Sequence, residues 1–429
     1  MTTTTATSEL IDKAKAARKA ARDLRKLSTG QKNDALRAIA DALDAGRSPV
    51  LEANALDMAA GRDAGLSEAV LGRLLLNDSR LGGMANDLRA IAALPDPVGE
   101  CFDSRALGNG IRVERRRVPL GVIGCVYESR PNVTTDIAGL CLKSGNAVVM
   151  RGGKEAVHSN AAIVAIVKEG LRNAGVDPEA VQFITDTDRA IVDQMIRLNE
   201  HFDLFIPRGG ETLIKYVREN ATVPAVTGGI GVVHVYVDAS ADARKARDIV
   251  FNAKTQRPDV CNALDTLLVH SSVAASLLPA AAAELAEAGV ELRCDQRALA
   301  LIGPAGSDQG GAVRSADPAD FGKEFLSLAM SVRVVDSIDE AIEHIEEHGS
   351  GHTEAIVTED YSAAARFTDE IDASVVLVNA STRFNDGGQL GLGAEVAIST
   401  NKLHARGPMG LRELTSYKWV ARGEGQVRP

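Results

Sequence analysis

"LGVIGCVYESRPNVTTDIAGLCLKSGNAVVMR", residues Leu120–Arg151, is the stretch that decides the fold. It holds two apolar runs rich in β-branched residues, 120–127 and 146–151, on either side of a helix-like segment, 134–145, that ends on a glycine. The apolar runs are continuous rather than alternating, which indicates strands that are buried on both faces. Such strands joined by helices predict a doubly wound α/β architecture, a parallel sheet covered by helices on both sides.

The same alternation continues along the chain. Further strands are expected at 181–185 and 202–206, and further helices at 156–174, 188–199 and 210–220. A second α/β series follows a soft boundary near residue 229, with strands expected at 232–237, 264–270, 298–303, 331–336, 354–359 and 374–379. The sequence shows neither a tandem repeat nor a low-complexity linker, so we expect two α/β units.

Upstream of the deciding stretch, residues 8–94 read as helices because apolar residues recur at three- and four-residue spacing. Ser28 and Gln31 have the spacing of a capping box. Residues 111–118 read as a strand with basic alternate positions, and its arginine run is either an anion patch or a solvated or subunit-facing strand. We expect this strand and residues 411–420 to be sheet edges that are covered in a symmetric homo-oligomer.

Composition excludes several function classes. Among the 429 residues, 45% are apolar and 25% charged, the net charge is -10 and aromatics are only 3%. This balance argues against nucleic acid as the main partner. No apolar run reaches the ~20 residues of a membrane span, and the first ten residues lack the basic and apolar regions of a signal peptide. The five cysteines show no CxxC spacing, which predicts a reducing, cytoplasmic location and no metal site.

Three Gly-Gly pairs follow expected strands, at 150–155, 207–212 and 226–231. At the carboxyl end of a parallel strand, glycine lets a ligand approach the backbone, and the following helix N-terminus attracts phosphate. None of the three has the GxGxxG spacing, and each alone is compatible with an ordinary tight turn. Three in successive strand–helix units favour a nucleotide cofactor.

The charge at the end of the second strand bears on which dinucleotide binds. NAD sites usually place an acidic residue against the ribose 2′-hydroxyl, whereas Arg151 and Lys154 stand here. Basic groups suit a 2′-phosphate, so the sequence favours NADPH/NADP, with the adjoining Glu155 as a feature against it.

Cys261 differs in context from the other cysteines. Cys125 and Cys141 lie among apolar residues and are expected in the core, whereas Cys294 is expected to be half exposed. Small residues follow Cys261, and Arg257 precedes it by four positions. A nearby cation favours the thiolate, the nucleophilic form of cysteine.

Five blocks in order resemble the gamma-glutamyl phosphate reductase (glutamate-5-semialdehyde dehydrogenase) family of the aldehyde dehydrogenase superfamily. They are "GVIGCVYESRPNVTTDIAGLCLKSGNAVVMRGGKEAVHSN", "QRPDVCNALDTLLVH", "GSGHTEAIVTED", "VNASTRFNDGGQLGLGAEVAIST" and "KLHARGPMGLRELTSYKWV". The resemblance covers essentially the whole chain. Asp265 departs from it, since the family commonly has Glu there.

The resemblance assigns roles residue by residue. It implies that Cys261 is the catalytic nucleophile, and that Arg130 or Asn132, in the "ESRPN" loop, completes the oxyanion site. The cofactor residues that it implies are Arg151, Lys154, Gly209, Gly210, Gly228, Gly229 and Glu324. The candidate substrate anchors are Arg257, Ser381, Thr382 and Arg383, chosen because cations and hydroxyls suit a carboxylate and a phosphate.

The implied reaction is NADPH-dependent reduction of L-glutamyl 5-phosphate to L-glutamate 5-semialdehyde and phosphate through a cysteine thioester, the second step of proline biosynthesis. The product would cyclise spontaneously to 1-pyrroline-5-carboxylate. Hydrolytic relatives carry a glutamate base where this chain has "VTGGIG" (226–231), so its thioester is expected to exchange with phosphate and not with water.

The resemblance also implies how the chain is organised. An NADP-binding domain is expected at 1–102 and 119–230, a catalytic domain at 231–403, and an oligomerisation element at 103–118 and 404–429. The expected partners are a second copy of the chain, in a homodimer or homotetramer, and glutamate 5-kinase.

Three alternatives stay open on the sequence. A CoA-dependent acylating aldehyde dehydrogenase shares the thioester and also needs no hydrolytic base. A cysteine hydrolase would pair Cys261 with His270, but an extended segment would separate them by about 30 Å. A non-catalytic scaffold would keep the fold and cofactor binding without turnover. His352 and His404 are read as structural residues, with a general-acid role as the alternative.

Overall fold

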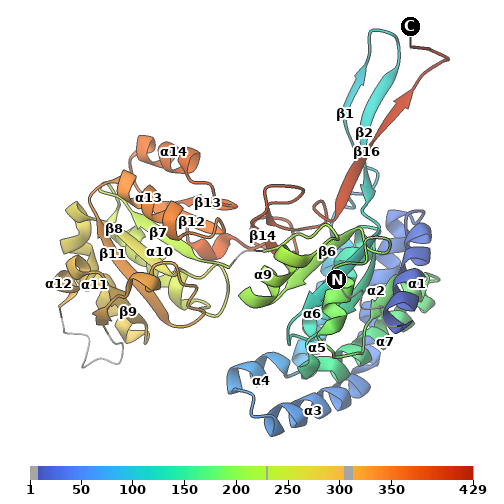
Figure 1. Cartoon of the computed structure of the whole chain (residues 1–429), viewed down its shortest axis with the longest axis horizontal. Coiled ribbons are helices and arrows are strands. Elements are labelled where there is room, and N and C mark those ends of the chain that lie inside the picture. The colour runs from blue at the N-terminus through green and yellow to red at the C-terminus, as the bar shows by residue number, and fades with distance from the viewer. Residues whose placement is uncertain (1–7, 229, 304–312, 429) are drawn as a thin grey trace. The chain divides into compact units, whose positions relative to one another are not determined.

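A computed structural model describes residues 8–228, 230–303 and 313–428 of the chain (Figure 1). They fall into two compact units. The first comprises Met1–Thr227, Gly391–Ala397 and Met409–Pro429, and the second comprises Gly228–Leu390 and Ile398–Pro408. Among the described helices, none is both long enough and apolar enough to cross a membrane.

Helices open the first unit, as the apolar spacing predicts. They are α1 (Ser8–Leu24), α2 (Thr29–Ala45), α3 (Arg47–Asp63), α4 (Glu68–Leu74) and α5 (Asp78–Ala93). The predicted capping box is present, because the Ser28 hydroxyl accepts from the Gln31 N–H while the Gln31 side chain accepts from the Ser28 N–H. Helix α2 packs its buried apolar face against α5 and a later helix, α7.

The stretch that decides the fold forms the centre of a four-stranded parallel sheet in the first unit, ordered β5-β4-β3-β6. Its elements are β3 (Val122–Tyr127), α6 (Asn132–Lys143), β4 (Ala147–Arg151), α7 (Val157–Asn173), β5 (Val181–Phe183), α8 (Ala190–Met195), β6 (Leu204–Arg208) and α9 (Glu211–Asn220). Strand β3 comes first in the chain and is flanked by β4 and β6, so the order reverses beside it. Ligands of open α/β sheets bind at the carboxyl ends of strands at such a point.

A three-stranded antiparallel sheet also belongs to the first unit, in the order β1 (Cys101–Ala106), β2 (Arg112–Pro119) and β16 (Thr415–Arg422). The prediction that 111–118 is an edge strand was wrong: β2 lies in the centre because β1, which the sequence did not predict, covers its other side. The Arg115 guanidinium lies over the rings of Tyr417 and Trp419, 4.9 and 4.7 Å from their centroids. Part of the basic run therefore stacks within this sheet.

The second unit contains a seven-stranded parallel sheet in the order β10-β9-β11-β8-β7-β12-β13. Its elements are β7 (Val233–Val237), α10 (Ala243–Thr255), β8 (Thr266–His270), α11 (Ser271–Glu287), β9 (Glu291–Cys294), α12 (Gln296–Ile302), β10 (Val313–Ser315), β11 (Ala329–Val335), α13 (Ile338–His348), β12 (Thr353–Val357), α14 (Tyr361–Glu370) and β13 (Val375–Val378). A short antiparallel pair, β14 (Ile398–Ser399) and β15 (Gly407–Pro408), completes it.

Two sequence predictions in this unit were wrong. Residues 298–303 were expected as a strand, but helix α12 covers most of them because the Asp295 side chain accepts from the Ala298 N–H at 2.7 Å and caps a new helix. Cys294 is not half exposed; it is buried at the end of β9, and burial raises the pKa of its thiol to about 12. Cys125 and Cys141 lie in the core as predicted.

Candidate active site

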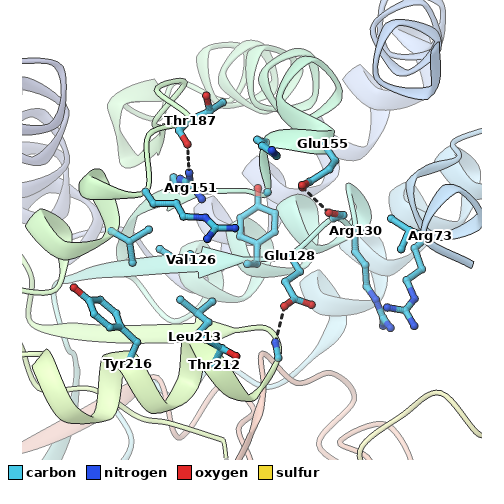
Figure 2. A pocket seen from close by; sticks show the side chains of 18 of the residues that line it. Arg73, Val126, Glu128, Arg130, Arg151, Glu155, Thr187, Thr212, Leu213 and Tyr216 are labelled. Carbon is cyan, nitrogen blue, oxygen red and sulfur yellow. Dashed lines mark hydrogen bonds between the residues drawn. The ribbon is translucent and has the colours of Figure 1, made fainter. Parts of the chain in front are cut away.

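A cavity of about 850 Å³ lies in the first unit at the carboxyl ends of β3, β4 and β6 (Figure 2). Val126 of β3 and Arg151 of β4 line it, as do Leu213 and Tyr216 from helix α9. The cavity therefore sits where the strand order reverses, and it combines apolar walls with charged side chains. A space of this kind fits an elongated ligand with an aromatic ring and anionic groups.

Glu128, which sequence reasoning missed, faces the start of helix α9 in this cavity. Its carboxylate accepts from the Gly210 N–H at 2.6 Å (Figure 2). No side chain of the helix itself caps this terminus. A Cβ at Gly209 would lie only 2.8 Å from the Glu128 Oε1, so a larger residue there would push the Glu128 side chain aside. The predicted pair Gly209 and Gly210 thus forms a turn that is already occupied by an anion.

The predicted basic residues of the cavity differ in their surroundings. Arg151 is buried, its guanidinium donates to the Thr187 carbonyl at 2.6 Å, and burial lowers its pKa. Lys154 lies exposed in the short 3₁₀ helix Lys154–Ala156 and lines the same cavity. The Glu155 carboxylate accepts from the Ser129 hydroxyl at 2.9 Å. Of the two predicted cations, Lys154 is the more accessible to a ligand.

The two candidates for the oxyanion site lie in different places. Arg130 lines the cavity together with Arg73 of α4 (Figure 2). Asn132 begins helix α6, and its side-chain amide donates to Asp136 at 3.3 Å. Burial raises the pKa of Asp136 to about 6. Arg130 therefore belongs to the surroundings of the cavity, and Asn132 to a separate polar pair on α6.

Cys261 lies in the second unit, in a partly exposed turn between α10 and β8. Two contacts fix the residue that follows it. The Asn262 side chain donates to the Asn385 carbonyl at 2.8 Å, and the Thr382 hydroxyl donates to the Asn262 carbonyl at 2.7 Å. The structure thus brings the predicted nucleophile together with the loop that carries the predicted substrate anchors.

The two predicted arginine anchors lie near Cys261. The Arg383 Nε donates to the Gln256 side chain at 2.8 Å. Burial lowers the pKa of Arg383, nearby Arg257 lowers it further, and the charge of Cys261 opposes both effects. Arg257 is exposed and lies 3.5 Å from Asp259. The charges around Arg383 are mixed, since the carboxylates of Asp386 and Asp259 act on it together with Arg257 and Cys261.

The hydroxyls of the same loop are already engaged. Ser381 and Thr382 are buried, and the Ser381 Oγ accepts from the Arg383 N–H at 3.3 Å. Since the Thr382 hydroxyl donates to Asn262, its role in the structure is to hold the Cys261 turn.

The predicted Glu324 belongs to a hydrogen-bond network of the second unit, which also contains the buried Lys254, a residue that the sequence did not suggest. The Glu324 side chain accepts from the Gly231 N–H at 3.1 Å. The next N–H, of Phe325, donates to the buried Asp265 at 2.9 Å, and Asp265 lies 3.9 Å from the buried Lys254. Burial raises the pKa of Asp265 and lowers that of Lys254, and the charge of each partner opposes the shift of the other.

The remaining predicted glycines give little support for a ligand site. A Cβ at Gly228 would lie 2.7 Å from the Ile398 carbonyl oxygen, so its close packing is accounted for within the second unit. Gly229 lies outside the described residues.

The histidines have structural surroundings. His352 is buried, with its Nδ1 2.6 Å from the Thr353 hydroxyl, and burial lowers its pKa to about 4. His404 is exposed in the second unit, with a φ of 68°. His270 ends β8 and caps helix α11 by accepting from the Ser272 N–H. Because Cys261 precedes the opposite end of β8, the Cys261–His270 dyad of a hydrolase has no support.

The sequence profile of the Aldehyde dehydrogenase family matches residues 1–309 and 324–420. The chain belongs to the aldehyde dehydrogenase family. Enzymes of this family use a nicotinamide dinucleotide, NAD or NADP. The predicted aldehyde dehydrogenase fold is confirmed.

Individual relatives narrow the similarity within the aldehyde dehydrogenase family. The chain is 57% identical over 412 residues to a gamma-glutamyl phosphate reductase from Chloroflexus aggregans, covering 96% of this chain and 97% of the relative. It is 54% identical over 420 residues to one from Dehalococcoides mccartyi, with 98% of each chain covered. The crystal structure of the Thermotoga maritima enzyme superposes with a TM-score of 0.95 at 48% identity, covering 98% of this chain and 100% of the other.

Proposed function

We propose that this chain reduces L-glutamyl 5-phosphate to L-glutamate 5-semialdehyde and phosphate, through a thioester on Cys261, in proline biosynthesis. The observation that carries the proposal is the similarity along nearly the whole chain to gamma-glutamyl phosphate reductases. The product has an amine positioned to attack its own aldehyde, so it cyclises to 1-pyrroline-5-carboxylate.

Cys261 starts the reaction as the nucleophile. Its thiolate attacks the γ-carbonyl of the substrate, phosphate leaves, and a thioester remains. Arg257 and Arg383 are proposed to favour the thiolate and to hold the substrate's carboxylate and phosphate. Ser381 and Thr382 fix the loop that carries Arg383.

The oxyanion that develops on the γ-carbonyl needs hydrogen-bond donors. The backbone N–H of Cys261 is one, and Arg130 or Asn132 supplies the other. A well-placed donor contributes about 3–4 kcal/mol to transition-state stabilisation. The variants Arg130→Met and Asn132→Ala show which residue is the donor. Loss of the oxyanion donor should lower kcat, whereas loss of a cofactor contact should raise the KM for NADPH.

The cofactor that fits the cavity of the first unit is NADPH, which supplies hydride when it is bound. The helix α9 terminus at Gly209 and Gly210 offers backbone N–H groups to a pyrophosphate, and Leu213 and Tyr216 offer an apolar wall to an adenine. Lys154 and Arg151 favour the 2′-phosphate of NADP, with Lys154 as the accessible cation. Glu324 and Gly228 are assigned to the cofactor by the sequence resemblance alone.

Preference for NADPH is tested by comparing Lys154→Ala with the parent enzyme. The variant should raise the KM for NADPH about twofold to fivefold, the loss of one exposed ion-paired contact of roughly 0.5–1 kcal/mol, and leave the KM for NADH nearly unchanged. Equal losses for both cofactors would remove Lys154 from the 2′-phosphate site.

The thioester is proposed to exchange with phosphate because segment 226–231 carries no carboxylate to activate water. In the oxidative direction, steady NADP⁺ reduction by glutamate semialdehyde should therefore require phosphate. Without phosphate the enzyme should give about one equivalent of NADPH per site and stop, and arsenate should restore turnover because its acyl ester hydrolyses in solution.

The same assay separates the alternatives. Turnover supported by CoA in place of phosphate would identify a CoA-dependent acylating enzyme. Steady turnover in phosphate-free buffer would identify a hydrolytic dehydrogenase. Binding of NADPH without any turnover would identify a scaffold.

The assembly and location belong to the same proposal. We expect a homodimer or homotetramer in the cytoplasm, with subunit contacts through the sheet of β1, β2 and β16. This sheet retains exposed edges in β1 and β16, and sheet edges are usually covered. The boundaries proposed for the NADP-binding, catalytic and oligomerisation domains are those predicted from the sequence. Glutamate 5-kinase is the proposed supplier of the unstable acyl phosphate. Light scattering at micromolar concentration tests the oligomer.

A further inference from the structure

We propose that Glu128 is an internal competitor of the cofactor: its carboxylate holds the helix α9 terminus and must leave before the dinucleotide pyrophosphate binds there. This inference rests on the proposed function, because it assumes that the cavity takes a dinucleotide. It assigns to Glu128 control over how tightly the cofactor binds and how quickly it is released.

The first observation is the hydrogen bond itself. The Glu128 Oε1 lies 2.6 Å from the Gly210 nitrogen, a short distance that is typical of a charge-assisted bond. Helix α9 runs from Glu211 to Asn220, and no side chain of its own caps it. The free N–H groups and the dipole of the helix attract an anion. Glu128, the residue that directly follows β3, supplies that anion from 82 residues earlier in the chain.

The second observation is that the backbone of Glu128 is fixed while its side chain is not enclosed. Its N–H donates to the Arg208 carbonyl at 3.0 Å, and its carbonyl accepts from the Arg130 N–H at 2.7 Å. The residue is nevertheless exposed to the cavity. A rotation of the side chain alone can therefore vacate the helix terminus, without any change in the fold.

The third observation is that the cavity offers the displaced carboxylate another position. Arg130 and Arg151 line the same cavity (Figure 2). The Arg151 Nε is buried and has no hydrogen-bond partner among the described residues. A Glu128 carboxylate that leaves helix α9 thus remains among cations, so its displacement weakens cofactor binding without abolishing it.

Two anions cannot share one helix terminus, because like charges at contact distance repel strongly in a partly desolvated site. Each binding event must therefore displace Glu128, and each release lets it return. Glu128→Gln keeps the shape of the side chain and removes its charge. We expect this variant to bind NADPH about tenfold more tightly and to release NADP⁺ correspondingly more slowly.

A fragment of the cofactor isolates the pyrophosphate position. Adenosine 2′-monophosphate has the adenine, the ribose and the 2′-phosphate but lacks the pyrophosphate, so its affinity should be the same in Glu128→Gln and in the parent enzyme. Glu155→Gln is the matched control, because it removes a carboxylate from the same cavity that is held by Ser129 and not by helix α9. It should change the affinities for NADPH and for the fragment by the same factor.

The affinities are measured by fluorescence titration of NADPH and by competition with the fragment. If the parent chain binds no NADPH, the proposed function fails. If the parent binds NADPH but Glu128→Gln binds it equally or more weakly, the internal competitor is refuted while the function stands. Equal gains for NADPH and for the fragment would also refute it, since they would reflect only the general charge of the cavity.

Discussion

Gly231→Ala should disable the enzyme through the backbone of Cys261. A Cβ on residue 231 would lie 1.9 Å from the Cys261 carbonyl oxygen and 2.8 Å from its Cα. Carbon atoms in real structures do not approach neighbours within 3.0 Å. Because both partners are backbone, the two segments must separate by at least about 1.1 Å, the difference between 3.0 and 1.9 Å.

This displacement sets the size of the expected effect. Misplacing a reacting group by about 1 Å costs on the order of 100-fold in rate. The strain of the added methyl group should also lower the free energy of unfolding by about 1–3 kcal/mol. Gly231→Ala should therefore reduce kcat about 100-fold in the phosphate-dependent oxidation of glutamate semialdehyde, while urea unfolding shows a folded protein of modestly lower stability.

Gly322→Ala is the matched control in the same unit. Its added Cβ would lie 3.7 Å from His348, an ordinary contact, so kcat should stay within about twofold of the parent value. The reasoning would be refuted by a folded Gly231→Ala variant whose kcat lies within threefold of the parent, because the turn would then tolerate the displacement.

Three further predictions follow from single residues. Cys261→Ser should abolish phosphate-dependent turnover and leave NADPH affinity nearly intact, and substantial residual turnover would move the nucleophile elsewhere. Asn146→Ala should cost about 2–5 kcal/mol in urea unfolding, because the buried side chain accepts from the Gly121 N–H and donates to the Leu414 carbonyl, and a change below 1 kcal/mol would contradict this. Burial lowers the pKa of His352 to about 4. Below about pH 6.5 the unfolded state therefore takes up a proton that the folded state does not, and stability should fall by about 1 kcal/mol between pH 7.5 and 5.5. Urea unfolding of His352→Gln should show a smaller loss over this range, and an unchanged loss would assign it to other groups.

The sequence predicts those parts of the fold whose burial leaves a local signal. Strands β3 and β4 are buried along their whole length, and their continuous apolar runs indicate this directly. Strand β1 is exposed at nearly every position, so its sequence has no apolar pattern that would predict a strand. Residues 298–302 form a continuous apolar run, which suits a buried strand as well as a helix, and the cap at Asp295 starts a helix there.

The sequence predicts a site residue only where its neighbours in the chain distinguish it. Cys261 is such a residue, because small residues follow it and Arg257 precedes it. The contact of Glu128 with Gly210 joins positions 82 residues apart, and it exists because β3 and β6 are neighbours in the sheet. The clash that makes Gly231 indispensable likewise depends on where Cys261 lies in space. No periodicity in the sequence carries information of this kind.

The pairing of β16 with β2 has a consequence during synthesis of the chain. Thr415 pairs with Pro119, which lies 296 residues earlier in the chain. A ribosome that adds about 5–20 residues per second needs roughly 15–59 seconds to make the second strand after the first. Until β16 is made, one edge of β2 has no partner strand, and an open sheet edge can pair with another chain. Charged side chains on an edge strand disfavour such pairing, and β2 carries Arg115, Arg116 and Arg117 through this interval.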